Sequence, residues 1–586
     1  MNFTEAVPLI GSLPPVYLIL ALLVVGLYIL YCQLLPKPIP GIYYNASSAS
    51  SLLGDWQDLT RTVGVTGEFG PWFADQVAKA GMPICQVFVR PFGKPWVLLA
   101  DYREAHDILT RRTAPAHNAD FDKSALITDS FSCLGDFTAA LQVTTPGERL
   151  KSSRALMQDL MAPSFLHGVM GPVIHDKSME LVRLLEAKMR LARGRPFSVK
   201  TDLDCAALDV ILYFAFAENF NRTSLGPQIE LVSRLVPDNM PDGHVDEPVT
   251  FPEVPAEDFI AAVRLAGGLV EGYIYSVVPR LTVWWWRRQS WYRKMFSQKS
   301  QVFGDQIRKV INGYQSGKGG EVRSALGYMV MREKREAEKH GRALNIETNI
   351  LADELFGEML AGNHTTGGVL SWLVKYLTKY SDIQAKLRES LHIALPQSVA
   401  ENRPPNSEEL RRTRLPYLDA FVEETLRLNP VPVTRQAIRD TTVLGRPIPK
   451  GCLVFLVSNG PGFLSPSLAI DASERSPAAQ TAKLNDRWDE TKDLRTFDPE
   501  RWLVHGSDGE VNAEFHGAAG PQLAFGLGAR GCWGKRLAQV ELRTVVALLV
   551  WHFELLGVPE ALAGNDATEV MIARRPQKVF VRLRKV

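Results

Sequence analysis

The sequence of 586 residues predicts a mainly α-helical protein with small β-sheets and one N-terminal transmembrane helix. Three observations support this fold class: an uncharged apolar run near the start, several long stretches with helical periodicity, and only a few short strand-like runs. A content of 46% hydrophobic and 22% charged residues is typical of a globular domain with a large core. The net charge of +2 gives no reason to expect nucleic acid as a partner.

The apolar run at residues 16–35 (VYLILALLVVGLYILYCQLL) predicts a membrane anchor, because it has no charge and is long enough to cross the hydrocarbon core. A cleaved signal peptide needs a basic start and a small-residue cleavage site, whereas this start carries Glu5 and the run ends in bulky residues. Basic residues, beginning with Lys37, follow the span. The positive-inside rule therefore places residues 1–15 in the lumen and the rest of the chain in the cytoplasm.

Residues 36–60 form a proline-rich linker and lead-in, whose prolines at 36, 38 and 40 predict a stiff, extended start. Residues 61–586 show no internal repeat and predict one cytosolic domain. Apolar residues recur at helical spacing in 179–191, 350–380, 417–428 and 535–553. Strand-like runs occupy 86–89, 96–99, 453–457 and 579–581. Two stretches, 237–257 and 465–495, predict long surface connections.

Four tryptophans interleave with basic residues between Trp284 and Phe296 (WWWRRQSWYRKMF). Such a run could bind a membrane surface or form an amphipathic helix on the protein surface, and the pattern does not decide between them.

The segment FGLGARGCWG, residues 525–534, is the strongest functional signal. None of the six scattered cysteines forms a CxxC pair, so no zinc site or disulfide framework is indicated. Glycines allow a tight loop that turns backbone N–H groups toward Cys532, and a following helix would further stabilise a thiolate. Arg530 adds a cation, and Phe525 offers an aromatic wall to a flat cofactor. A plain glycine-rich turn would not need this ordered set of Phe, Gly, Arg, Cys and Gly.

This segment resembles the haem-binding loop of the cytochrome P-450 family, FxxGxRxCxG, at every specified position, including Gly534. The resemblance implies the cytochrome P-450 fold and haem b, with Cys532 as the axial thiolate ligand of the iron. It also implies that Arg530 pairs with a haem propionate and that Phe525 packs near the sulfur. Thiolate ligation pushes electron density onto the iron and favours O–O cleavage.

The segment Glu424-Thr425-Leu426-Arg427 lies on a predicted helix, where residues three apart share a face and can pair. It resembles the ExxR helix of the same family. The segment FDPERW, ending at Trp502, resembles the family's PERF segment with Trp in place of Phe. The resemblance implies a structural network of Glu424, Arg427 and Arg501 behind the haem.

The segment AGNHTT, residues 361–366, lies inside the predicted helix 350–380, and its glycine and threonines lower helix propensity and can bend a helix locally. It resembles the family's oxygen-binding motif AGxDTT, which implies that Thr365 donates a hydrogen bond to dioxygen and helps to deliver protons. His364 stands where the family has an acid. We hypothesise that it replaces the acid in the proton path, because a neutral imidazole can both donate and accept.

Two further arginines resemble propionate ligands of the family. Arg154 lies four residues after Leu150, as in the family's WxxxR helix, with Leu150 in place of Trp. Arg435 follows the ExxR helix at the spacing where the family often has another cation.

The resemblance implies a monooxygenase that inserts one oxygen atom from dioxygen into a lipophilic organic substrate, as in secondary metabolism of filamentous fungi. Electrons would come from NADPH through NADPH-cytochrome P-450 reductase, whose acidic surface could meet Lys535 and Arg536. The expected location is the endoplasmic reticulum membrane, with the catalytic domain facing the cytoplasm. Two alternatives stay open: a reductase-independent haem-thiolate isomerase or dehydratase of hydroperoxides, against which Thr365 argues, and a non-enzymatic haem-binding membrane protein.

Overall fold

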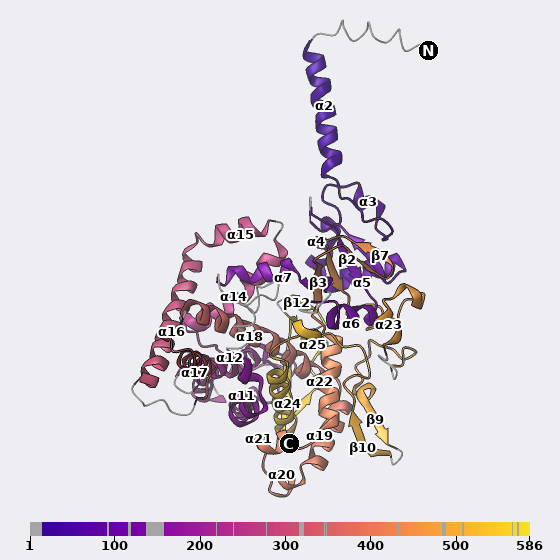
Figure 1. Cartoon of the computed structure of the whole chain (residues 1–586). Coiled ribbons are helices and arrows are strands. Elements are labelled where there is room, and N and C mark those ends of the chain that lie inside the picture. Colours follow the sequence, from indigo (N-terminus) through magenta and orange to yellow (C-terminus); the bar gives the residue numbers. More distant parts are fainter. Residues whose placement is uncertain are drawn as a thin grey trace.

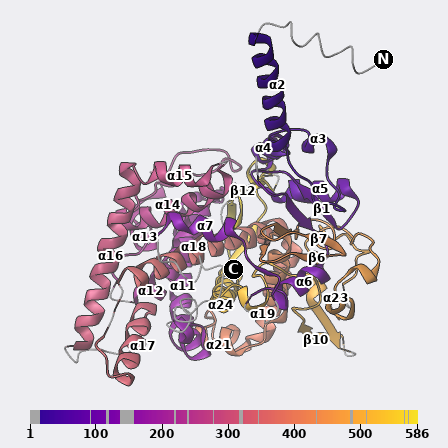
Figure 2. The same cartoon turned by 45° about the horizontal axis from the view of Figure 1, so that its top comes forward.

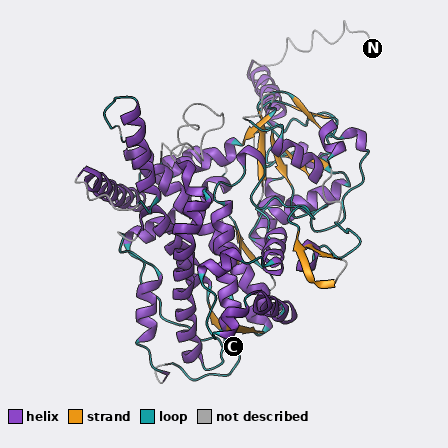
Figure 3. Cartoon of the chain, turned by 60° about the horizontal axis from the view of Figure 1, so that its bottom comes forward, coloured by secondary structure: helices purple, strands orange, loops and turns teal. Residues whose placement is uncertain are grey.

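The computed structural model of the chain consists of a mainly helical body from which a single helix, α2 (Pro15–Leu34), extends (Figure 1). It describes residues 15–90, 93–114, 119–135, 157–217, 220–237, 240–276, 278–315, 322–344, 346, 348–431, 433–482, 488–506, 509–564, 566–570 and 573–586. The expected fold class, mainly α with small β-sheets, is confirmed (Figure 3).

Helix α2 is long and apolar enough to cross a membrane, because Val16–Leu34 has a mean hydropathy of 2.3 and none of it is buried in the body. The linker after it is not a free spacer. Ile39 and Ile42 are buried, and the side chain of Gln86 accepts a hydrogen bond from the Ile39 N–H (2.8 Å). The same amide donates to the carbonyl oxygens of Ile39 (2.9 Å) and Ile42 (2.8 Å). The start of the linker is therefore docked on the body.

Helix α18 (Thr348–Lys379) runs through the body and packs against helices from both halves of the chain. Its neighbours are α12 (Lys200–Phe216), α14 (Asp258–Tyr275), α16 (Ser290–Gln315), α22 (Pro416–Leu428) and α24 (Lys535–His552). The other helices are α3 (Ala46–Ala49), α4 (Trp56–Thr66), α5 (Gly70–Ala80), α6 (Tyr102–Thr110), α7 (Ala125–Ser130), α10 (Pro163–Phe165), α11 (Gly171–Ala192), α13 (Leu225–Ser233), α15 (Pro279–Trp286), α17 (Ala325–Lys339), α19 (Ser381–Ala394), α20 (Pro396–Ala400), α21 (Ser407–Arg412), α23 (Pro477–Thr481) and α25 (Glu560–Ala563).

The main sheet has five strands in the order β1-β2-β8-β5-β3 and lies beneath the base of α2. Its strands are β1 (Ile84–Val87), β2 (Trp96–Leu99), β8 (Leu453–Leu456), β5 (Val433–Ala437) and β3 (Phe121–Lys123). The β2–β8 pair is parallel and the others are antiparallel. Smaller sheets contain β4 (Phe197–Ser198), β6 (Thr441–Val443), β7 (Arg446–Ile448), β9 (Leu503–Gly506), β10 (Gly509–Phe515), β11 (Phe553–Leu556), β12 (Thr568–Val570), β13 (Arg574–Pro576) and β14 (Phe580–Lys585).

The sequence predictions of the individual elements are largely confirmed. Each of the four periodic stretches coincides with a helix, namely α11, α18, α22 or α24, although the stretches 350–380 and 535–553 run one residue past theirs. Each strand-like run coincides with or overlaps a strand. The aromatic-basic run does not form a single helix. It spans α15, a break and the start of α16, with Trp284 and Trp285 exposed and Tyr292 and Met295 buried.

Candidate active site

The loop that carries Cys532 has the tight, glycine-dependent shape expected from its sequence. Gly526 and Gly528 have φ angles of +59° and +67°, in the left-handed region that favours glycine. The Cys532 N–H donates to the Phe525 carbonyl oxygen at 2.7 Å and closes the loop. Helix α24 begins directly afterwards, at Lys535. Burial and the carboxylate of Glu358 raise the pKa of Cys532, while the N–H groups of Gly534 and Lys535, donating to the sulfur, lower it.

Cys532 lines a cavity that helix α18 also lines. The loop contributes Phe525, Arg530 and Gly534 to the same cavity, and α18 contributes Thr365. The remaining lining residues are Lys123, Met157, Met161, Ile211, Phe214, Glu358, Ala361, Gly362, Thr366, Gly531, Trp533, Leu537, Ala538 and Glu541. Folding thus brings the predicted sulfur ligand and the predicted oxygen-side threonine to one largely apolar space.

Two carboxyl groups on this cavity were not predicted from the sequence. Burial and the neighbouring Glu354 raise the pKa of Glu358 to about 7, and burial raises that of Glu541 well above its usual range. Both are therefore protonated much more readily than a carboxyl in water. The regular helical pattern of α18 and α24 does not separate these positions from ordinary surface acids.

Arg530 and Arg435 form a buried cationic corner beside the loop. Arg530 lies 3.0 Å from Asp122 of β3 and donates through Nε to the Ala114 carbonyl oxygen at 3.3 Å. Arg435 of β5 donates through Nε to Thr113 Oγ1 at 3.3 Å, while its Nη2 is buried and has no hydrogen-bond partner among the described residues. Burial lowers the pKa of Arg435 to about 10. The corner therefore suits a further anionic group.

Glu424 and Arg427 form the predicted pair, fully buried on α22. The guanidinium donates to both carboxylate oxygens, at 2.8 and 2.7 Å. Arg501 stands at the edge of this pair, with Nε 3.8 Å from Glu424. Trp502 makes the shorter contact, since its indole N–H donates to Glu424 at 2.9 Å. Trp502, which stands where the PERF segment has Phe, is thus itself a partner of the Glu424 carboxylate.

Thr365 and His364 point to different surroundings. The Thr365 hydroxyl borders the cavity and donates back to the Ala361 carbonyl oxygen at 2.6 Å, the local bond expected of a mid-helix threonine. The His364 ring packs on Gly267 of α14, since a Cβ at Gly267 would stand 2.4 Å from its Nε2. Burial and the nearby Arg575 lower the pKa of His364 to about 4. The imidazole is therefore neutral at physiological pH.

Arg154 and Leu150 lie outside the described residues, so the expected contact of Arg154 with a propionate stays a prediction.

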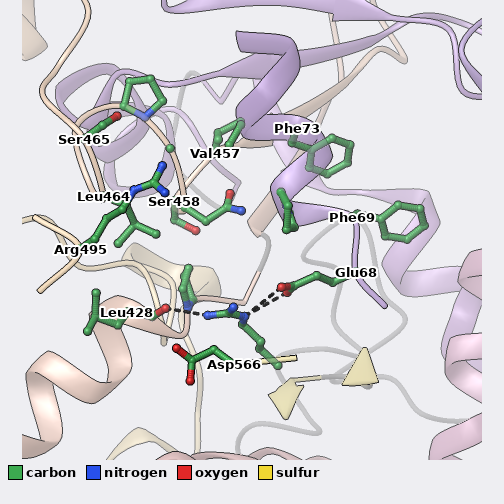
Figure 4. A pocket seen from close by; sticks show the side chains of 18 of the residues that line it. Glu68, Phe69, Phe73, Leu428, Val457, Ser458, Leu464, Ser465, Arg495 and Asp566 are labelled. Atoms are coloured by element: carbon green, nitrogen blue, oxygen red, sulfur yellow. Dashed lines mark hydrogen bonds and ion pairs between the residues drawn. The ribbon is translucent and has the colours of Figure 1, made fainter. Parts of the chain in front are cut away.

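A second, larger cleft of about 630 Å³ lies between α5, β8 and the C-terminal end of α18 (Figure 4). Its wall includes the ion pair of Glu68 with Arg574 (3.1 Å) and the side chains of Ser465 and Arg495. It shares no lining residue with the cavity of Cys532. The larger of the two cavities is therefore not the one that Cys532 and Thr365 line.

The fold and the cavity lined by Cys532 are those of a haem-thiolate protein, and comparison with known proteins supports the same class. The cytochrome P-450 family model matches residues 73–460 and 492–582. A cytochrome P-450 monooxygenase, xilC of Penicillium crustosum, is 38% identical and covers 96% of this chain and 95% of its own. The cytochrome P-450 monooxygenase TRI13 of Fusarium sporotrichioides is 33% identical, covering 97% of this chain and 99% of its own.

The crystal structure of the cytochrome P-450DA haem domain is similar in fold, with a TM-score of 0.64 over 94% of this chain and 98% of that chain at 16% identity. The chain belongs to the cytochrome P-450 family and is an oxidoreductase of the monooxygenase type.

The residues present fit a haem. Cys532 supplies a sulfur at the wall of the cavity that Phe525 also lines. The unpartnered Nη2 of Arg435, together with Arg530, provides buried cationic donors for acidic substituents of a porphyrin.

Proposed function

We propose that this enzyme inserts one oxygen atom from dioxygen into a lipophilic organic substrate and releases the other atom as water. Electrons come from NADPH through NADPH-cytochrome P-450 reductase. The observation that carries this proposal is the placement of Cys532 and Thr365 on one cavity, from elements far apart in the sequence. A thiolate-ligated haem b, when bound, supplies the oxygen-activating chemistry.

The chain's residues hold this cofactor in complementary ways. The sulfur of Cys532 would hold the iron of this cofactor, and the N–H groups of Gly534 and Lys535 would stabilise the negative charge of the sulfur. Phe525 packs beside the sulfur. Arg530, Arg435 and Arg154 would bind the propionates, while Glu424, Arg427 and Arg501 would maintain the fold behind the cofactor. Because Arg435 and Arg530 are buried, their bonds to propionates would be charge-assisted and shielded from water.

Residues of α18 would deliver the protons that the reaction consumes. Thr365 holds a proton on Oγ1 at the cavity wall, and His364 takes over the part of the family's acid. Since His364 is neutral, it relays a proton by accepting on one ring nitrogen and donating from the other. Its buried Nε2, which lacks a hydrogen-bond partner among the described residues, supports this role as an acceptor.

The substrate is a lipophilic small molecule of fungal secondary metabolism. The apolar lining of the cavity supports the lipophilic character, with Met157, Met161, Ile211 and Phe214 among its residues. The fungal monooxygenases xilC and TRI13 support the metabolic setting. Turnover of a panel of fungal metabolites by the purified protein with reductase would identify the substrate class.

The protein is a single-pass protein of the endoplasmic reticulum membrane with its catalytic domain, residues 61–586, in the cytoplasm. Residues 1–15 are lumenal. Helix α2 supports the anchor, and α15 lies at the edge of the body on the side toward which α2 extends (Figures 1 and 2). Exposed Trp284 and Trp285 on α15 give this edge an aromatic contact with the headgroup region.

The reductase docks where α24 begins, on the exposed cations Lys535 and Arg536. Replacing both with Glu should slow the reduction of the haem by about tenfold at low salt, because attraction to an acidic surface is lost. Stopped-flow reduction at several salt concentrations measures this change. The exposed Lys334 and Arg335 of α17, also changed to Glu, provide the control. An unchanged rate and salt dependence in the Lys535 and Arg536 variant would exclude this docking site.

The Cys532→Ser variant tests the whole proposal. A serine hydroxyl is not a thiolate, so the thiolate signature in the carbon monoxide difference spectrum should vanish together with NADPH-dependent turnover. Cys32→Ser, which changes an exposed cysteine of α2, should keep both. If Cys532→Ser retains both the signature and turnover, Cys532 is not the ligand and the proposal fails.

A further inference from the structure

Residues 461–482 and 488–495, here called the strap, lie on the surface of the body and largely between the two ranges that match the cytochrome P-450 family. The residues between these two limbs lie outside the described part of the chain. The strap's two limbs are joined where Glu490 accepts hydrogen bonds from the Ser467 N–H (2.7 Å) and hydroxyl (2.6 Å). Both ends of the strap line the cleft of Figure 4, the first through Leu464 and Ser465 and the second through Arg495.

The first limb of the strap is bound to α6 by charged and polar contacts. Arg475 donates to the Asp101 carboxylate at 2.9 and 2.6 Å. The Ser476 N–H donates to Glu104 (2.9 Å) and its hydroxyl to Asp107 (2.8 Å). All three carboxylates are buried, so these contacts add to the partners that compensate their lost hydration, such as Arg112 for Glu104 (3.0 Å). Helix α23 of the strap lies beside α6 in Figure 1.

Helix α6 in turn supports the cysteine loop and the cationic corner. A Cβ at Gly528 would stand 2.2 Å from the Leu109 carbonyl oxygen, so the end of α6 packs directly on the loop. The residues just after α6, Thr113 and Ala114, accept the hydrogen bonds of Arg435 and Arg530. A displacement of α6 would therefore move both the loop and the partners of its neighbouring arginines.

The second limb places Trp488 on the network of Glu424. Its ring lies 5.2 Å from the Arg427 guanidinium and 5.7 Å from that of Arg501. Its ring centroid is also 5.7 Å from that of Trp502, which donates to Glu424. The fit is close, since a Cβ at Gly520 would stand 2.3 Å from the Trp488 ring. An aromatic face over two guanidinium groups stabilises their positive charge in a buried site.

We propose that the strap is a positioning element for the haem, which it holds through two separate contacts. Arg475 and Ser476 fix α6 against the cysteine loop, and Trp488 fixes Arg427 and Arg501 beside Glu424. These three strap residues are positioning residues, since they act through α6 and the buried network. The inference rests on the proposed haem site, but it concerns how firmly the cofactor is retained.

Haem release from the full-length holoenzyme to excess apomyoglobin tests this proposal. Trp488→Ala and the double variant Arg475→Ala with Ser476→Ala should each release haem about tenfold faster, because each loses contacts of the kind that shift an equilibrium by that factor. Trp488→Phe keeps an aromatic face and should release haem at close to the original rate. The carbon monoxide spectrum should show a larger share of protein without the thiolate signature in the fast-releasing variants.

Two controls separate this effect from general destabilisation. Arg234→Ala removes an exposed ion pair with Glu230, and Trp285→Ala removes an exposed tryptophan; neither should change haem release. If Trp488→Ala and the double variant both release haem at the original rate, the strap does not position the haem. If Trp488→Ala cannot be isolated, the double variant decides, and haem release at the original rate in that variant overturns the proposal. The proposed function fails separately, when the unchanged protein itself lacks a thiolate signature or turnover.

Discussion

At the residue scale, the properties of His364, which replaces an acid in the AGxDTT motif, depend on what surrounds its ring in the fold. The sequence predicted its place in α18 and its departure from the family's acid. It did not predict that the ring packs on Gly267, close enough to Asp204 and Arg575 for both to influence its pKa. That arrangement makes the imidazole difficult to protonate, which restricts the hypothesised relay to the neutral ring.

This low pKa predicts a pH-dependent stability. An imidazole in the unfolded chain has a pKa near 6.5, whereas that of His364 in the fold is about 4. The contribution of the neutral ring is thus fully present above pH 6.5 and is lost as the pH falls toward 4, by up to about 3 kcal/mol. Urea unfolding at several pH values should show this loss, and the His364→Phe variant should lack it. An equal pH dependence in both proteins would contradict the burial of a titrating His364.

The catalytic hypothesis for His364 has its own measurement. Turnover and the leakage of peroxide are compared for the original protein, His364→Asp and His364→Phe. Loss of the relay in His364→Phe should lower turnover and raise leakage, because reduced oxygen is released before the proton arrives. If neither variant differs from the original protein, His364 has no part in proton delivery.

Other residues of the site could be predicted to different extents. Cys532, Thr365 and the Glu424–Arg427 pair were predicted because each carries a local pattern, and the structure brings the first two to one cavity. Asp122 had no such pattern, since it meets Arg530 only after distant segments pack. The hydrogen bond from Trp502 to Glu424 could not be predicted for the same reason, although the sequence shows Trp in place of Phe at this position.

At the scale of elements, the contact between α6 and the cysteine loop restricts what position 528 can hold. Gly528→Ala should destabilise the protein by about 3 kcal/mol or more and lower its haem content. The added Cβ meets the Leu109 carbonyl oxygen, and alanine is strained at a φ of +67°. Thermal unfolding and the haem content of purified protein measure both effects.

Gly81→Ala is the matched control for that change. Gly81 also has a left-handed φ, +61°, but nothing lies within 4 Å of an added Cβ. It should cost only the conformational strain, about 1 kcal/mol, and leave the haem content unchanged. Equal effects of the two substitutions would show that the contact with α6 does not matter.

The elements themselves were predicted best where they are long and periodic. Helices α18, α22 and α24 follow the pattern of apolar residues closely. Strand β1 begins two residues before its predicted start, because all of its residues are buried and no alternation defines its ends. The break between α15 and α16 was missed, since aromatic and basic residues continue through it without a proline or glycine.

At the scale of the whole molecule, the docked linker predicts that two truncations will behave differently. Removing residues 1–35 should free the protein from carbonate-washed membranes and change the free energy of unfolding by less than about 1 kcal/mol. Removing residues 1–43 also deletes buried Ile39 and Ile42, and should cost about 4 kcal/mol or more. Sedimentation and urea unfolding of the two proteins measure the difference. Equal stabilities would show that the linker is not part of the core.

The hydrogen bonds from Gln86 to the backbone just after α2 affect how this helix is connected to the body. The Gln86 amide holds Ile39 and Ile42 from a strand of the main sheet, and Tyr31 in α2 donates to the Ser50 carbonyl oxygen at 3.1 Å. Helix α2 is therefore joined to the body by a docked segment rather than by a free linker. In a bilayer spanned by α2, a tilt of this helix would therefore be passed on to the main sheet.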